Sequence, residues 1–158
     1  MVSIQDRLGR PTPLAMTFLL ILFFSMSGTL AMADDAPQPP LPTVDMSIND
    51  TPITVEIAST AQQRYMGLSF RKFLGPNSGM LFVYPDERPL TFTMRNTLIP
   101  LSIAFLSKDL VINEIHDMDV GPDQLFPSRK SAQYALEVDQ GWFATNGINV
   151  GDQLVRQE

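Results

Sequence analysis

VDMSINDTPITVEI, residues 44–57, is the stretch that decides the fold class. Apolar side chains recur at every second position on both sides of Asn49-Asp50: Val44, Met46 and Ile48 before the pair, and Ile53, Val55 and Ile57 after it. Alternation of this kind is typical of half-buried strands, and Asn-Asp is a common turn pair, so the stretch predicts a β-hairpin. Thr54 and Glu56 are then expected to point away from the apolar face.

The chain beyond the hairpin predicts more short strands. MLFVY, residues 80–84, is apolar without alternation, which indicates a strand covered on both faces, and a chain reversal is expected at residues 85–89. Further strands are predicted at 90–95, 101–107, 110–117, 133–139 and 153–156, with a long loop at 118–131. A short helix is expected at 61–68, where Thr60 and Gln63 resemble a capping box, and a helical turn at 141–147. Residues 44–158 are therefore predicted to form a single mainly β domain, a small barrel or jelly-roll-like sandwich of about eight strands.

The segment before the hairpin has the features of export. Arg7 and Arg10 precede an apolar run at residues 14–26, and Ala31-Met32-Ala33 fits a small-x-small cleavage site. We expect residues 1–33 to be a secretory signal peptide cleaved after Ala33, so that the mature protein is periplasmic or secreted and has no transmembrane helix. Residues 34–43, with four prolines, are expected to form an extended tether.

Composition excludes several classes of function. The formal net charge is −6, which is unsuited to binding a phosphate backbone, so nucleic acid is not an expected partner. The chain has no Cys, which excludes disulfides and a thiol nucleophile, and its one His excludes metal sites built on two imidazoles. We expect no cofactor.

Four residues are candidates for a ligand site. Arg95 and Asn96 lie where a predicted strand gives way to a loop, and Arg95 alternates away from the apolar face. Its guanidinium could bind an anionic ligand, or it could pair with a neighbouring Glu or Asp while Asn96 hydrogen-bonds the turn backbone. On the strand 110–117, a period of two places Ile112, Glu114 and His116 on one face, with Met118 next. A carboxylate beside an imidazole could be an acid/base couple or a structural hydrogen bond.

Other polar and aromatic residues have simpler interpretations. Glu137 and Asp139 alternate with Leu136 and Val138, which indicates a solvated strand face. The pair Trp142-Phe143 is expected to plug one end of the core. His116 and Met118, with Met80 and Met94 available, also provide ligand types that copper accepts.

Several blocks of the chain together resemble a known family. They are GMLFVY at 79–84, MRNTLIPLSIAF at 94–105, EIHDM at 114–118, YALEV at 134–138 and GWF at 141–143. The sequence resembles the uncharacterised domain-of-unknown-function family 192 over residues 53–154. The resemblance implies a compact, mainly β fold and brings no established activity. The family usually has Trp where this chain has Thr93, so a site lined by that ring would be altered here.

The function that we expect is non-enzymatic. An exported binding module would hold a small molecule, peptide or envelope partner in an apolar cleft edged by Arg95, Asn96, Glu114 and His116. The alternatives are an enzyme using Glu114 and His116 as acid and base, a copper-handling protein using His116 and Met118, and a structural component of the envelope.

Overall fold

Nine strands and two short helices make up the part of the chain that the structure, a computed structural model, describes: residues 35–157 without 122–123. The predicted signal peptide and its cleavage site at Ala33 lie outside the described residues. The elements are β1 (Thr43–Ile48), β2 (Thr51–Ala58), α1 (Ala61–Met66), β3 (Ser78–Arg88), β4 (Thr91–Thr93), β5 (Leu101–Leu106), β6 (Ile112–Met118), β7 (Leu125–Pro127), β8 (Ala132–Asp139), α2 (Trp142–Thr145) and β9 (Leu154–Arg156). The predicted mainly β class with one short helix and a helical turn is confirmed.

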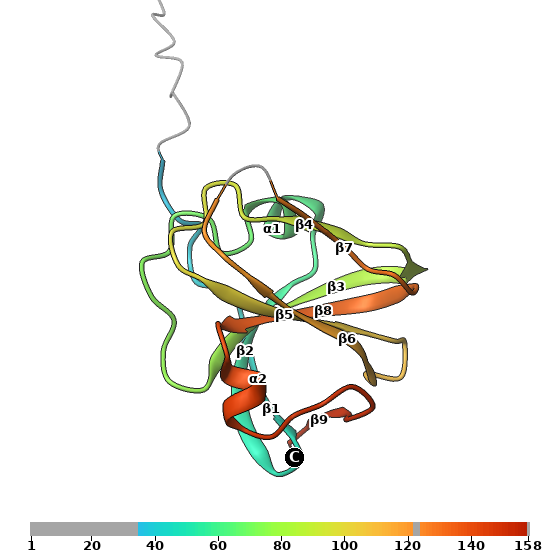
Figure 1. The fold of residues 1–158 in the computed structure, drawn as a ribbon. Helices are drawn as coiled ribbons and strands as arrows, with labels where there is room; N and C mark the ends of the chain where they lie inside the picture. Colours follow the sequence, from blue (N-terminus) through green and yellow to red (C-terminus); the bar gives the residue numbers. More distant parts are fainter. Residues whose placement is uncertain (1–34, 122–123, 158) are drawn as a thin grey trace, which may run out of the picture. The chain divides into compact units, whose positions relative to one another are not determined.

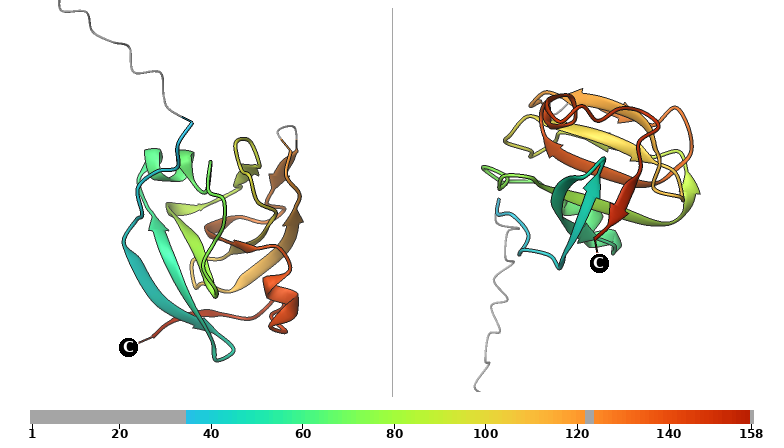
Figure 2. Two further views of the ribbon diagram at one scale, coloured as in Figure 1. Left: turned by 90° about the vertical axis from the view of Figure 1, so that its left-hand side faces the viewer. Right: turned by 90° about the horizontal axis from the view of Figure 1, so that it is seen from below.

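Seven strands form one curled sheet, in the order β6-β5-β8-β3-β2-β1-β9, and β4 pairs with β7 in a separate ribbon (Figure 1). Only the β2–β3 pair of the large sheet is parallel. The curl brings the starts of the two edge strands together, and Val111 forms an isolated bridge with Gln153. The sheet therefore approaches a barrel, as the two further views show (Figure 2). No helix of the described segments has the length and apolar character needed to cross a bilayer.

Each face of the sheet packs against its own hydrophobic core. Leu81, Leu136 and Phe143 belong to a first cluster, which includes the buried side of the β1–β2 hairpin and α2. Met80 and Phe82 belong to a second cluster on the other face, together with Phe92 of β4. In Figure 1, α1 and the β4–β7 ribbon gather at the opposite end of the domain from α2 and β9. The apolar run of β3 is thus buried on both faces, as its lack of alternation predicts.

Local sequence signals account for the turn and the cap. Asn49 and Asp50 both have positive φ, of 48° and 63°, as a tight hairpin between right-twisted strands requires. The predicted capping box is formed, since the Thr60 side chain accepts from the Gln63 amide and the Gln63 side chain accepts from the Thr60 amide. Helix α1 ends at Gly67, whose φ of 48° and ψ of −133° suit glycine alone.

Three sequence expectations are wrong in detail. Residues 85–88 continue β3 instead of reversing the chain, and the long loop contains the short strand β7. A β-bulge shifts the β5–β6 register between Phe105 and Leu106, so Ile112 packs in the first cluster while Glu114 and His116 lie on the other face. A bulge inserts one unpaired residue, and a period of two cannot be carried across it.

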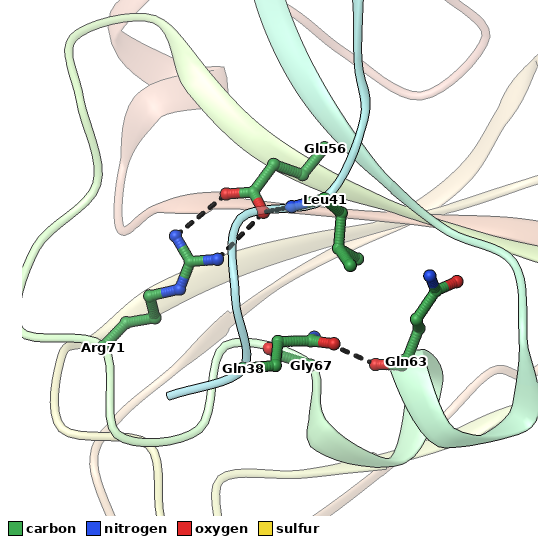
Figure 3. A network of polar contacts seen from close by, with 6 residues as sticks. All are labelled: Gln38, Leu41, Glu56, Gln63, Gly67 and Arg71. Atoms are coloured by element: carbon green, nitrogen blue, oxygen red, sulfur yellow. Dashed lines mark hydrogen bonds and ion pairs between the residues drawn. The ribbon is translucent and has the colours of Figure 1, made fainter. Parts of the chain in front are cut away.

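The Pro-rich segment before β1 is bonded to the domain (Figure 3). Gln38 donates to the carbonyl oxygens of Gln63 and Gly67, at 3.1 and 2.8 Å. Glu56 accepts from the Leu41 amide at 2.8 Å and forms a two-pronged ion pair with Arg71, at 2.9 and 2.8 Å. Glu56 is therefore half-buried and bonded, unlike the free outward side chain that alternation predicts.

Candidate functional site

A cavity of about 210 Å³ opens on the face of the sheet that α1 and β4 cover. We call it the Glu137 cavity. Its lining comes from the end of α1 and the loop after it, from β3, from β4 with the loop that follows, and from β8. The lining includes Arg64, Tyr65, Phe82, Tyr84, Phe92, Thr93, Arg95, Asn96 and Glu137. Because these elements are far apart in sequence, no single motif could have revealed the cavity.

Glu137 is the buried ionisable group of this cavity. The expectation of a solvated face for Glu137 is wrong, since its exposed fraction is 5%, whereas Asp139 at the end of the same strand is exposed. Among the described residues, no group donates a hydrogen bond to its carboxyl group, and the carboxyl oxygens remain accessible from the open cavity. Burial raises the pKa of Glu137 to about 8, because the charged form loses its hydration without gaining a partner. The carboxyl group is therefore mainly protonated at neutral pH.

The position of Glu137 follows from strand pairing. Glu137 lies opposite Met80 of β3 on one side and Ile103 of β5 on the other, at the centre of the sheet. The neighbouring Gly79 allows the strands to approach closely, since a Cβ atom there would come within 2.5 Å of the Glu137 carbonyl oxygen. Met80 and Ile103 are both buried in paired strands, which fixes the place of the carboxyl group between them.

Aromatic rings and a clamped arginine form the wall beside Glu137. Phe82 and Phe92 meet edge to face, with 4.9 Å between ring centroids. The Arg64 guanidinium lies 4.7 Å from the centre of the Tyr84 ring and donates to the carbonyl oxygens of Ser59 and Val83, the latter at 2.9 Å. Burial raises the pKa of Tyr84, an effect that the nearby positive charge of Arg64 opposes. The wall thus combines aromatic rings with one phenol group and one guanidinium that is already engaged.

Arg95 and Asn96 lie at the rim of the cavity. Arg95 is exposed and follows buried Met94, as the alternation predicts. Its Nη2 donates to the Tyr65 hydroxyl at 2.7 Å, and its guanidinium lies 5.6 Å from the centre of that ring. Asn96 has a φ of 62°, and its carbonyl oxygen accepts from the Phe70 amide at 2.7 Å. Asn96 therefore shapes the loop that presents Arg95.

Glu114 and His116 are brought together, but outside the lining of this cavity. His116 Nε2 and Glu114 Oε2 are 3.1 Å apart, within the hydrogen-bond reach that their spacing predicts. The other Glu114 oxygen accepts from the backbone amides of Arg129 and Lys130, at 2.6 and 3.0 Å. Burial disfavours the Glu114 charge, yet these amides and His116 hold its pKa below the ordinary value. The pair holds the loop before β8.

The residues proposed as copper ligands differ in their exposure to solvent. His116 is partly exposed and engaged with Glu114, whereas Met118 is fully buried in the second hydrophobic cluster. Met80 and Met94 belong to the same cluster. Within the described residues, no group of three His, Cys, Asp or Glu side chains that could hold a metal ion is found.

Thr93 and Trp142 complete the candidates from the sequence. Thr93 lines the Glu137 cavity and is exposed, so the one visible departure from the family pattern falls at this site. Phe143 is buried in the first cluster with Trp142 packed against it, and the Trp142 indole donates to Asn77 Oδ1 at 3.1 Å. The expected aromatic plug is confirmed.

Comparison with known proteins gives a family and two similar folds. The sequence matches the DUF192 family, described as "Uncharacterized ACR", over residues 44–156. A crystal structure from Sinorhizobium meliloti 1021, of a protein with a suggested role as a transcription regulator, is 29% identical with a TM-score of 0.72; the match covers 75% of this chain and 97% of that one. A protein of unknown function from Novosphingobium aromaticivorans DSM 12444 is 30% identical with a TM-score of 0.69, covering 75% and 89%. A search of the curated proteins gives no match.

Proposed function

The chain belongs to the DUF192 family, and we propose that it is an exported binding module whose Glu137 cavity holds a small molecule. The observation that carries the proposal is the buried carboxyl group of Glu137, which lines an open cavity without a hydrogen-bond donor of its own. Burying an unpaired polar group lowers the stability of the fold. Such a group therefore indicates a binding site whose ligand supplies the missing partner.

The size of the cavity favours a small molecule over a peptide. Its volume of about 210 Å³ is below the range of roughly 300–1,000 Å³ found for sites of drug-sized ligands. The lining combines aromatic rings with about as much polar as apolar surface, which suits a small polar ligand. The net charge of −6 gives no support for extending to this chain the regulatory role suggested for the Sinorhizobium protein.

The alternative functions have less support. An enzyme using Glu114 and His116 would need the pair beside a cleft, whereas the pair lies outside the lining of the Glu137 cavity and Glu114 holds the backbone amides of Arg129 and Lys130. The purely structural alternative needs no cleft, and the cavity argues against it.

Export is the second part of the proposal and rests on residues 1–33. Arg7, Arg10, the apolar run and the Ala31-x-Ala33 site support cleavage after Ala33. Amino-terminal sequencing of the protein recovered from its native envelope is expected to begin at Asp34. A sequence that begins at Met1 would contradict processing.

Native mass spectrometry of the same material tests the binding function. Protein purified gently from the native envelope is expected to carry a small molecule, and Thr93→Trp, which fills the mouth of the cavity, is expected to lose it. Val155→Trp on β9 is the matched control, because Val155 is exposed and does not line the cavity. An empty wild-type protein, or equal occupancy in both variants, would refute the proposal.

A further inference from the structure

The Glu137 cavity has an acidic group at its base and a basic group at its rim. At its base, Glu137 is 5% exposed, and within the described residues no group donates a hydrogen bond to its carboxyl oxygens, which are accessible from the cavity. At its rim, the Arg95 guanidinium forms no salt bridge with any carboxylate of the residues that the structure describes. The base therefore offers a carboxyl group whose charged form a cation would stabilise, and the rim offers a guanidinium that an anion would pair with.

We propose that the ligand of this cavity is a small zwitterion, with its ammonium group on Glu137 and its anionic group on Arg95. This inference rests on the proposed binding function and names the class of ligand. An amino acid is the simplest member of this class.

The base of the cavity suits an ammonium group for two reasons. A carboxylate surrounded by low-dielectric walls gains most from a partner that carries a full positive charge, because water does not screen the pair. Phe82, Tyr84 and Phe92 line the same space; the Tyr84 ring already meets the Arg64 and Arg88 guanidinium groups, which leaves Phe82 and Phe92 as the rings that an ammonium group could meet. Binding converts the carboxylic acid into a carboxylate, and the proton that it loses passes to solvent.

The rim suits an anionic group because Arg95 is oriented and only partly used. The Tyr65 hydroxyl takes one N–H of Nη2, and the Tyr65 ring lies beside the guanidinium. A guanidinium has five N–H donors, so most remain available for a carboxylate or phosphate. Arg64, the other cation of the lining, is instead engaged with two backbone carbonyls and the Tyr84 ring. Arg95 is therefore the group left for the ligand.

No other acidic side chain lines the cavity, so Glu137 is the group that must meet the ligand's cation. The ionisable and charged groups that share the lining are Arg64 and Tyr65 of α1, Tyr84 of β3 and Arg95 after β4; β5, which pairs with β8, has no charged residue. The two arginines of the lining also disfavour a ligand that is only a cation.

Isothermal titration calorimetry of the mature domain with three probes tests the proposal. The probes are 4-aminobutyrate, which has both groups, n-butylamine, which has only the amine, and butyrate, which has only the carboxylate. Glycine and 6-aminohexanoate extend the test to shorter and longer zwitterions. The variants are Glu137→Gln and Arg95→Gln, which keep size and remove one charge each.

A zwitterion is expected to bind at least about tenfold more tightly than either single-charge probe. Glu137→Gln is expected to lose this advantage and leave butyrate affinity unchanged, while Arg95→Gln is expected to leave n-butylamine affinity unchanged. At pH 7, titrations in buffers of different ionisation enthalpy are expected to show about one proton released per ligand by the wild type and none by Glu137→Gln.

Equal affinity for all probes, or a zwitterion affinity that is insensitive to Glu137→Gln, would overturn the zwitterion inference. If no probe binds while the native protein still carries a small molecule that Thr93→Trp loses, the ligand class is wrong and the binding function stands. If the native protein is also empty, both fail.

Discussion

Replacing Glu137 with Gln is expected to stabilise the domain, and more strongly as the pH rises. Burial raises the pKa of Glu137 from 4.5 to about 8, so between these values the folded state holds a proton that the unfolded state has released. Stability from this group is then fully present below pH 4.5 and is lost as the pH approaches 8. Gln has a similar size and does not ionise, so the Glu137→Gln variant does not lose this part of its unfolding free energy as the pH rises.

The magnitude follows from the linkage relation. Each pH unit in this window costs the wild type about 1.4 kcal/mol, so the loss between pH 5 and pH 7.5 is about 3 kcal/mol. The difference in unfolding free energy between Glu137→Gln and the wild type should grow by that amount across the same interval. It should level off above pH 8.

Urea denaturation of the ligand-free protein at several pH values measures this difference. Asp139→Asn is the matched control, because Asp139 ends the same strand but is exposed, and its difference from the wild type should stay nearly constant. A flat Glu137→Gln difference between pH 5 and pH 7.5, or one that falls with pH, would refute a buried, unpaired carboxyl group.

Three further predictions concern the scaffold. Phe105→Ala is expected to cost about 3–5 kcal/mol by urea denaturation, because Phe105 is fully buried; a cost below about 1 kcal/mol would contradict the second core. Glu56→Ala is expected to cost about 1–3 kcal/mol and to increase proteolysis of residues 35–42, because it removes the partner of Arg71 and of the Leu41 amide; a neutral change would mean that these bonds contribute nothing. Glu114→Gln is expected to destabilise the domain at pH 7 and less so as the pH falls below 4.5, because the pKa of Glu114 is lowered; a pH-independent cost would contradict that charge.

The sequence predicts local features of the fold well because their causes are local. The Asn49-Asp50 turn, the Thr60–Gln63 capping box and the burial of β3 on both faces each depend on a few adjacent residues. The bulge that separates Ile112 from Glu114 depends on the partner strand, and no pattern within one strand could show it. Strand pairing is the information that a period of two does not contain.

In the candidate site, too, the residues with local sequence signals were predicted, and the residue that depends on strand pairing was not. Arg95 and Asn96 were predicted from a strand end and do line the cavity. Glu137 was missed because alternation with Leu136 and Val138 normally marks a solvated face, whereas here α1 and β4 cover that face. The available signal was the uninterrupted apolar run of β3: a strand paired beside it at the centre of the sheet is also covered on both faces.

The most direct test of the central claim is a carbon-13 NMR titration of the Glu137 carboxyl group in the mature, ligand-free domain, with Glu137→Gln used to assign its resonance. The account predicts a titration midpoint near 8, since burial without a partner favours the protonated form. The same resonance should show an ionised carboxylate at pH 7 once a zwitterion is bound. A midpoint near the ordinary 4.5 in the empty domain would mean that Glu137 is already solvated or paired, and would contradict the account.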